Sequence, residues 1–212
     1  MSAQTEAASR ISLRVPPNWV QFDIQRAVRT GELTRIVDEH LKKLPALKPH
    51  RRDILKALRR LADEAESAGA VLCAAAVDEA ADDGALLATL AAFITDGMPE
   101  PALNTVPAIA AQITATPRVD GADPGCEPDW REVRIVDIPA GRAVRIRSLT
   151  TLHGETAERG VRIVSMETLL PLPGSDRILN VVLTSPQPQL TDELLELFDL
   201  ITETLSWGMS PA

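Results

Sequence analysis

The chain has 212 residues, of which 45% are hydrophobic and 25% are charged, a balance that excludes a disordered chain and allows a buried core. Only 3% of the residues are aromatic and none is tyrosine, which excludes an obvious aromatic surface for stacking bases or sugars. The formal net charge of -8 disfavours general binding to nucleic acids or anionic membranes, because both depend on a positive surface.

The N-terminal segment gives no targeting signal. Residues 1–9 have neither the basic nor the apolar region of a signal peptide, and no run of about 18 apolar residues occurs anywhere. The sequence therefore predicts a cytoplasmic protein without membrane insertion. Residues 1–9 and 208–212 are expected to be flexible ends.

The first part of the chain predicts one strand followed by helices. Apolar and polar residues alternate over 11–15, as in a half-buried strand, and Pro16 ends the pattern. Apolar residues then recur at steps of three and four, as on one face of a helix. The expected helices span 23–29, 33–44 and 49–68.

Two alanine-rich apolar runs follow, separated by the acidic turn 78–84. Turn residues bound both runs, which favours strands at 70–77 and 85–95, although alanine also permits helices there. A further helix is predicted over 104–114. The stretch 116–129 contains several Pro and Gly residues and predicts a mobile loop.

The block from Trp130 to Trp207 predicts successive strands closed by one amphipathic helix. Short connections separate the apolar runs, and they suit antiparallel neighbours because a parallel pair needs a crossover of about a dozen residues or more. The expected strands are 132–138, 142–149, 161–170 and 177–184, and the expected helix is 191–207.

This order of elements predicts an α+β fold with a largely antiparallel β-sheet covered by helices. We expect the strand at 11–15 and the pair between 70 and 95 to join this sheet. The sequence predicts a single α+β domain over 10–207, in which 31–69 is a helical elaboration.

Short motifs at both ends of the chain resemble a known fold family. An opening strand runs into Val15-Pro16-Pro17-Asn18-Trp19, and a closing Val181-Val182-Leu183-Thr184-Ser185-Pro186 precedes a helix with Leu197-Phe198-Asp199-Leu200-Ile201. The arrangement resembles the PsbP-like α/β/α sandwich, shared by the PsbP extrinsic subunit of photosystem II, a Ran-binding nuclear transport factor and the LpqN type of bacterial lipoprotein. The resemblance implies a module that binds other proteins, and it transfers no functional residue.

The usage of alanine and arginine is similar to that of proteins from GC-rich bacteria. We therefore expect a bacterial protein, with a role accessory to secretion or to another multiprotein assembly.

The sequence contains no recognisable motif for catalysis, cofactor binding or metal binding. It has no glycine-rich phosphate loop and no serine elbow, and its histidines have no partner at metal-ligand spacing. Cys73 lies in an apolar run, where a thiol behaves as a small buried hydrophobe, whereas Cys126 lies in a polar loop. A disulfide between them remains open. The sequence predicts no catalytic residue, no cofactor and no metal.

A basic span stands out within the acidic chain. Eight Lys and Arg residues fall between Lys42 and Arg60, where Asp53 is the single acid. Such a span can bind phosphate or an acidic partner, and it is also typical of a solvated helix face. The candidate partner-binding residues are Lys48, Arg51, Arg52, Lys56, Arg59 and Arg60.

The absence of catalytic motifs favours a non-catalytic protein-interaction module, which binds a protein partner through the basic span or an open sheet edge. The first alternative is a binder of a small apolar ligand between sheet and helices. Its cavity would be lined from Ile163, Leu169, Val182 and Phe198.

The second alternative is an enzyme without a recognisable motif. Its first candidate residues are His40, His153 and Cys126. A homo-oligomer is open as well, because an edge strand at 10–15 can pair with a second copy or be covered by a loop.

Overall fold

The computed structural model describes residues 10–22, 31–43, 45–79, 85–116, 128–152 and 160–208. Its main element is a seven-stranded sheet in which every neighbouring pair of strands is antiparallel. The strands are β2 (Trp19–Phe22), β3 (Ala70–Glu79), β4 (Ala85–Asp96), β5 (Trp130–Ile138), β6 (Gly141–Leu152), β7 (Val161–Pro171) and β8 (Arg177–Ser185). Their order across the sheet is β2-β3-β4-β8-β7-β6-β5.

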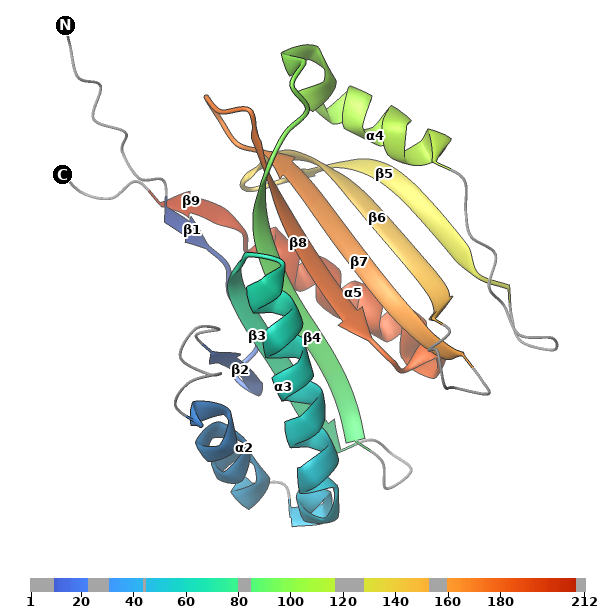
Figure 1. The fold of residues 1–212 in the computed structure, drawn as a ribbon. Coiled ribbons are helices and arrows are strands. Elements are labelled where there is room, and N and C mark those ends of the chain that lie inside the picture. The colour runs from blue at the N-terminus through green and yellow to red at the C-terminus, as the bar shows by residue number, and fades with distance from the viewer. Residues whose placement is uncertain are drawn as a thin grey trace, which may run out of the picture.

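Helices cover both faces of this sheet, which confirms the predicted α+β class (Figure 1). The helices are α2 (Glu32–Lys43), α3 (Arg51–Ser67), α4 (Val106–Ala115) and α5 (Thr191–Glu203), with short 3-10 helices η1 (Pro45–His50), η2 (Pro101–Asn104) and η3 (Pro188–Leu190). The helix predicted at 23–29, most of the loop at 116–129 and the tip of the acidic turn lie outside the described residues.

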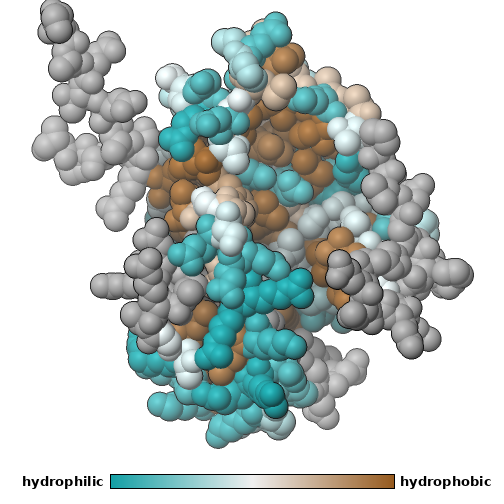
Figure 2. All heavy atoms as spheres, viewed as in Figure 1, coloured by the Kyte–Doolittle hydropathy of each residue, from teal (hydrophilic) through white to brown (hydrophobic). Residues whose placement is uncertain are grey.

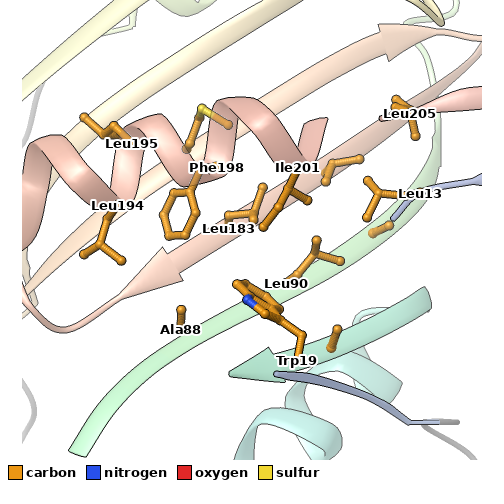
Figure 3. Packing of buried hydrophobic residues seen from close by; sticks show 14 of the residues in the cluster. Leu13, Trp19, Ala88, Leu90, Leu183, Leu194, Leu195, Phe198, Ile201 and Leu205 are labelled. Carbon is orange, nitrogen blue, oxygen red and sulfur yellow. The ribbon is translucent and has the colours of Figure 1, made fainter. Parts of the chain in front are cut away.

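The larger core lies between α5 and one face of the sheet. Side chains of a strand alternate between the two faces, so Val181 and Leu183 of β8 point toward α5 while Val182 points away. Phe198 of α5 is fully buried among these side chains and lies above β4 and β8 (Figure 3). The apolar stripe at three- and four-residue steps predicted this buried face of α5 correctly.

The opposite face of the sheet carries two separate apolar clusters. Leu33, Val37 and Leu58 of α2 and α3 pack on β3 and β4, where Cys73 and Ala75 point toward them. At the other end, α4 packs on β5, β6 and β8 through a cluster that includes Ile109, Val144, Ile146 and Ile178. Figure 1 shows α3 and α4 in front of opposite ends of the sheet, with α5 behind it.

The prediction that the opening strand joins the main sheet is wrong. β1 (Arg10–Ser12) pairs with β9 (Ser206–Gly208) in a separate two-stranded sheet. The helix predicted to reach Trp207 ends at Glu203, because Thr204 bonds back to the Ile201 carbonyl and to the backbone of Arg14. Trp207 then lies in β9, where its indole N–H donates to the Ala140 carbonyl at 2.7 Å.

The sequence also failed to predict β2, the strand at one edge of the main sheet. It has only four residues, and Trp19 and Val20 are consecutive apolar residues, so no alternation of apolar and polar side chains marks it as a strand. It pairs with β3, with Trp19 opposite Ala76, and the Trp19 side chain is buried in the α5 core. The predicted edge strand is thus paired with β9, and β2 and β5 are the edges of the main sheet.

Candidate functional site

The six predicted partner-binding residues lie together on the outer surface of α3 and the end of η1. All are exposed, and five of them line an open hollow of about 730 Å³; Lys48 in η1 lies outside its lining. Figure 2 shows hydrophilic side chains gathered over α3 on this face of the molecule. The α3 face that carries them is opposite to its buried stripe of Ile54, Leu58 and Ala62.

Contacts within the protein occupy the guanidinium groups of three of these residues. Arg51 donates two hydrogen bonds to Asp38 of α2, at 2.6 and 2.9 Å, and these bonds hold the pKa of the Asp38 carboxyl below its usual value. Arg59 donates to the Thr34 hydroxyl at 3.1 Å, and Arg60 donates to Glu64 one turn further along α3 at 2.7 Å. These three arginines therefore fasten α3 to α2 or to its own acids.

The other three cations form what we call the basic ridge: Lys48, Arg52 and Lys56, spaced four residues apart. Within the described part of the chain, none of the three makes a hydrogen bond or an ion pair, and all are exposed. Arg52 and Lys56 are four residues apart on α3 and are therefore neighbours on its surface, and Lys48 precedes them in η1. Asp53, the acid nearest in sequence, is three residues from Lys56 and lies beside the ridge, but the two side chains form no ion pair among the described residues.

A second concave feature lies on the α5 side of the main sheet, between β1 and the strands β3, β4 and β8. It is a pocket of about 220 Å³ with an entirely apolar set of lining side chains. Its lining residues are Ile11, Leu13, Val71, Leu72, Ala92, Ile94, Val181 and Leu205. Val71 sits where the β3–β4 register shifts, and it is 57% exposed, so the pocket communicates with solvent. We call it the β1 pocket.

The cavity predicted from the sequence has a different set of residues, which the structure separates. Phe198 is buried in the core under α5, whereas Ile163, Leu169 and Val182 face the other side of the sheet. The sequence pattern placed apolar residues on strands correctly, but it could not assign a face to each strand before the pairing was known. The four residues therefore do not line one cavity.

The candidate residues for an enzyme do not come together in the described structure. Cys126 and His153 lie outside the described residues, as does the His40 side chain, while His50 is exposed at the end of η1. Cys73 is a buried free thiol, and burial raises its pKa to about 11, which suits a packing role. Among the described residues, no group of three or more His, Cys, Asp or Glu side chains is placed to hold a metal ion.

A buried polar cluster between α5 and β6 was not predicted from the sequence. Arg145 is only 7% exposed and donates to Asp199 at 2.5 Å and to the Thr202 hydroxyl at 2.8 Å, while Arg147 donates to the other oxygen of Asp199. Burial lowers the pKa of Arg145, and the Asp199 charge opposes that shift. Asp199 and Thr202 lie next to the apolar stripe of α5, which was the one signal available in the sequence.

No helix in the described part of the chain is both long and apolar enough to span a membrane.

Comparison with known proteins leaves the family open. No protein-family model matches the chain, and no curated protein matches it significantly. Among solved structures, the fold is similar to that of LpqN of Mycobacterium tuberculosis, described as involved in cell envelope biogenesis, over 97% of this chain and 87% of that chain. The sequences are 9% identical and the TM-score is 0.46, values at which the similarity carries no argument about function.

Proposed function

We propose that this protein is a non-catalytic interaction module that binds an acidic protein partner through the basic ridge. The observation that supports this proposal is the contrast between two sets of cations on η1 and α3. Arg51, Arg59 and Arg60 have partners within the chain, whereas Lys48, Arg52 and Lys56 have none among the residues that the structure describes.

The negative charge of the whole chain makes the basic ridge a distinct site for an acidic partner. A net charge of -8 repels acidic partners from most of the surface, so an acidic protein is attracted only where positive charge is concentrated. The hollow of about 730 Å³, which Arg52 and Lys56 help to line, offers contact area for a partner. A folded or extended acidic segment can lie in this hollow and face Arg52 and Lys56.

The test compares the wild type with the triple variant Lys48→Gln, Arg52→Gln, Lys56→Gln. Binding of a fluorescein-labelled glutamate-rich peptide is followed by fluorescence anisotropy at low and physiological salt. Three exposed ion pairs of about 0.5 kcal/mol each should be lost, which weakens binding about tenfold. Arg51 and Arg60 are left unchanged, because their substitution would break contacts within the protein.

The matched control removes the same charge elsewhere, through Arg14→Gln, Arg142→Gln and Arg177→Gln, three exposed positions away from α3. The control should bind the peptide as the wild type does, and it should retain any partner captured from native cell extract that the ridge variant loses. Equal weakening in both triple variants would reduce the effect to net charge and contradict the proposal.

A second candidate function, binding of a small apolar ligand, is favoured by the β1 pocket. Enclosed apolar cavities bind small hydrocarbons, as a leucine-, isoleucine- and phenylalanine-lined cavity of about 150 Å³ does for benzene. The β1 pocket has a similarly apolar lining and is open to solvent, which gives a ligand a way in. A pocket of about 220 Å³ takes a slightly larger molecule.

Titration with butylbenzene, followed by methyl NMR, tests this second function. The methyl signals of Leu13, Leu72 and Leu205 should move, while those of Leu41 and Leu58 in the α2–α3 cluster should not. The variant Ala92→Leu fills the pocket and should abolish the shifts. Shifts spread evenly over both groups, or none at all, would rule out the pocket as a ligand site.

A further inference from the structure

A two-stranded sheet fastens the beginning of the described chain to its end. We call it the clasp: it consists of β1 and β9, which pair over three residues of each strand. Among the described residues it joins no strand of the main sheet, and Figure 1 shows it as a separate pair of arrows beside that sheet. An isolated pair of such short strands is marginally stable in water, so the clasp depends on contacts with the rest of the protein.

Hydrogen bonds connect the clasp to neighbouring backbone. The Thr204 hydroxyl, two residues before β9, accepts a bond from the Arg14 N–H, two residues after β1, at 2.8 Å. The indole N–H of Trp207, in the middle of β9, donates to the Ala140 carbonyl in the turn between β5 and β6 at 2.7 Å. This indole bond breaks when β9 leaves its place, so its N–H group reports whether the clasp is closed.

The clasp and the residues beside it form one wall of the β1 pocket. Ile11 lies in β1, Leu13 follows that strand directly, and Leu205 directly precedes β9. Figure 3 shows Leu13 and Leu205 at the same end of α5. The facing wall consists of apolar residues of β3, β4 and β8. The pocket of about 220 Å³ thus lies between the clasp and the main sheet, and side chains of the protein do not fill it.

We propose that a small apolar molecule in the β1 pocket holds the clasp closed. This inference rests on the second candidate function, the binding of an apolar ligand in that pocket. A ligand there touches both walls and adds dispersion contacts between the clasp and the sheet. When β1 and β9 separate, one wall moves away and the ligand loses these contacts. The ligand therefore binds the closed form more tightly, and by linkage it shifts the chain toward that form.

Closure of the clasp controls the exposure of an apolar surface. Ile11 and Trp207 are partners across the clasp, and both are half-buried and pack against the α5 core. Opening of the clasp lifts these two side chains away from the core and exposes them to solvent, together with the pocket wall. A ligand in the pocket keeps this surface covered, so the state of the two strands depends on whether the pocket is filled.

Exchange of the indole N–H protons with solvent, followed by NMR on the full chain, tests the coupling. Butylbenzene at about ten times its dissociation constant should slow exchange at Trp207 about tenfold, because only the ligand-free fraction opens. Trp130, at the opposite end of β5 from the Ala140 turn, is the internal control, and its exchange rate should not change. Thr204→Val leaves the pocket lining intact but removes the bond from Arg14, so it should speed exchange at Trp207 about fivefold.

Larger side chains at Ala92 test the coupling without a ligand. Ala92→Val and Ala92→Leu fill the pocket progressively, and each should slow exchange at Trp207 in the absence of butylbenzene. Methyl signals of the pocket leucines that move with butylbenzene, while exchange at Trp207 stays the same, overturn the proposal and leave ligand binding intact. Methyl signals that do not move overturn ligand binding and the proposal together. Equal slowing at Trp130 also overturns the proposal, because it shows a general gain in stability.

Discussion

Asp199 accepts hydrogen bonds from two arginines of β6 at the interface between α5 and the sheet. Arg145 has little access to water, so its charge depends on this carboxylate. Such a contact adds little net stability when it is intact, but removal of one member leaves an uncompensated buried charge. The cluster therefore fixes the position of α5 more than it strengthens the fold.

We expect Asp199→Leu to lower the free energy of unfolding by about 3 kcal/mol, measured by urea denaturation, because Arg145 then stays buried without a counter-charge. The double variant Asp199→Leu, Arg145→Met should regain much of this loss. As a control, Glu39→Ala removes an exposed pair with Arg35 on α2 and should change stability by no more than about 0.5 kcal/mol. Similar small losses in all variants would show that Arg145 reaches water after all.

The basic ridge illustrates what the sequence reveals about single residues. The composition of the span between Lys42 and Arg60 predicted an exposed basic helix face, and the structure confirms the exposure. The sequence could not show that Arg51 is bonded within the protein while Arg52 is not, because the partner of Arg51 is Asp38, 13 positions away on another helix. That distinction depends on how α2 packs on α3.

At the scale of elements, the end of β4 is tied to the turn between β7 and β8 through Gly97. Its N–H donates to the Asp176 carbonyl at 2.8 Å, and a Cβ built on Gly97 would lie 2.1 Å from that same oxygen. The next nearest atoms belong to the Asn104 side chain, which is held in place by two hydrogen bonds to the Met98 backbone. The close approach therefore requires glycine at this position.

Gly97→Ala should destabilise the protein by about 2–3 kcal/mol, because the turn must move away from β4 and lose its hydrogen bond. Thermal unfolding followed by circular dichroism measures the effect. Gly69→Ala is the comparison: it has a φ of +72° but open space around it, so it should cost only about 1 kcal/mol. The opposite ranking of the two variants would show that the turn adapts freely.

Helices and strands with a clear periodicity of apolar residues could be predicted from the sequence. Elements that depend on contacts between distant residues could not. The strands β5 to β8 and the helices α2, α3 and α5 follow their apolar periodicity to within a few residues. The end of α5 departs from it, because Leu205 continues the helical spacing while Thr204 bonds to Arg14 at the other end of the chain. Tertiary contacts override local preference there.

At the scale of the whole molecule, the sheet consists of two meanders. In one, β2, β3 and β4 are neighbours in order, and in the other β5, β6, β7 and β8 are neighbours in order. The sequence predicted the antiparallel pairing of β5 to β8 from their short connections, but it missed β2 and so its pairing with β3. It could not predict that β4 pairs with β8, a contact that joins Thr89 to Thr184 across 95 positions.

The pairing of β4 with β8 bears on the order in which the chain folds. The strands within each meander can pair at a smaller cost in loop entropy; α3 packs on the first meander, whereas α5 packs on residues of both. We expect the β4–β8 ladder to form after the pairings within the second meander, because its loop of 95 positions must close before its contacts stabilise it, and the β1–β9 pairing, which joins the two ends of the chain, to form later still. Until β4 and β8 pair, two long apolar strand edges are exposed, so aggregation during refolding should begin at β4 and β8.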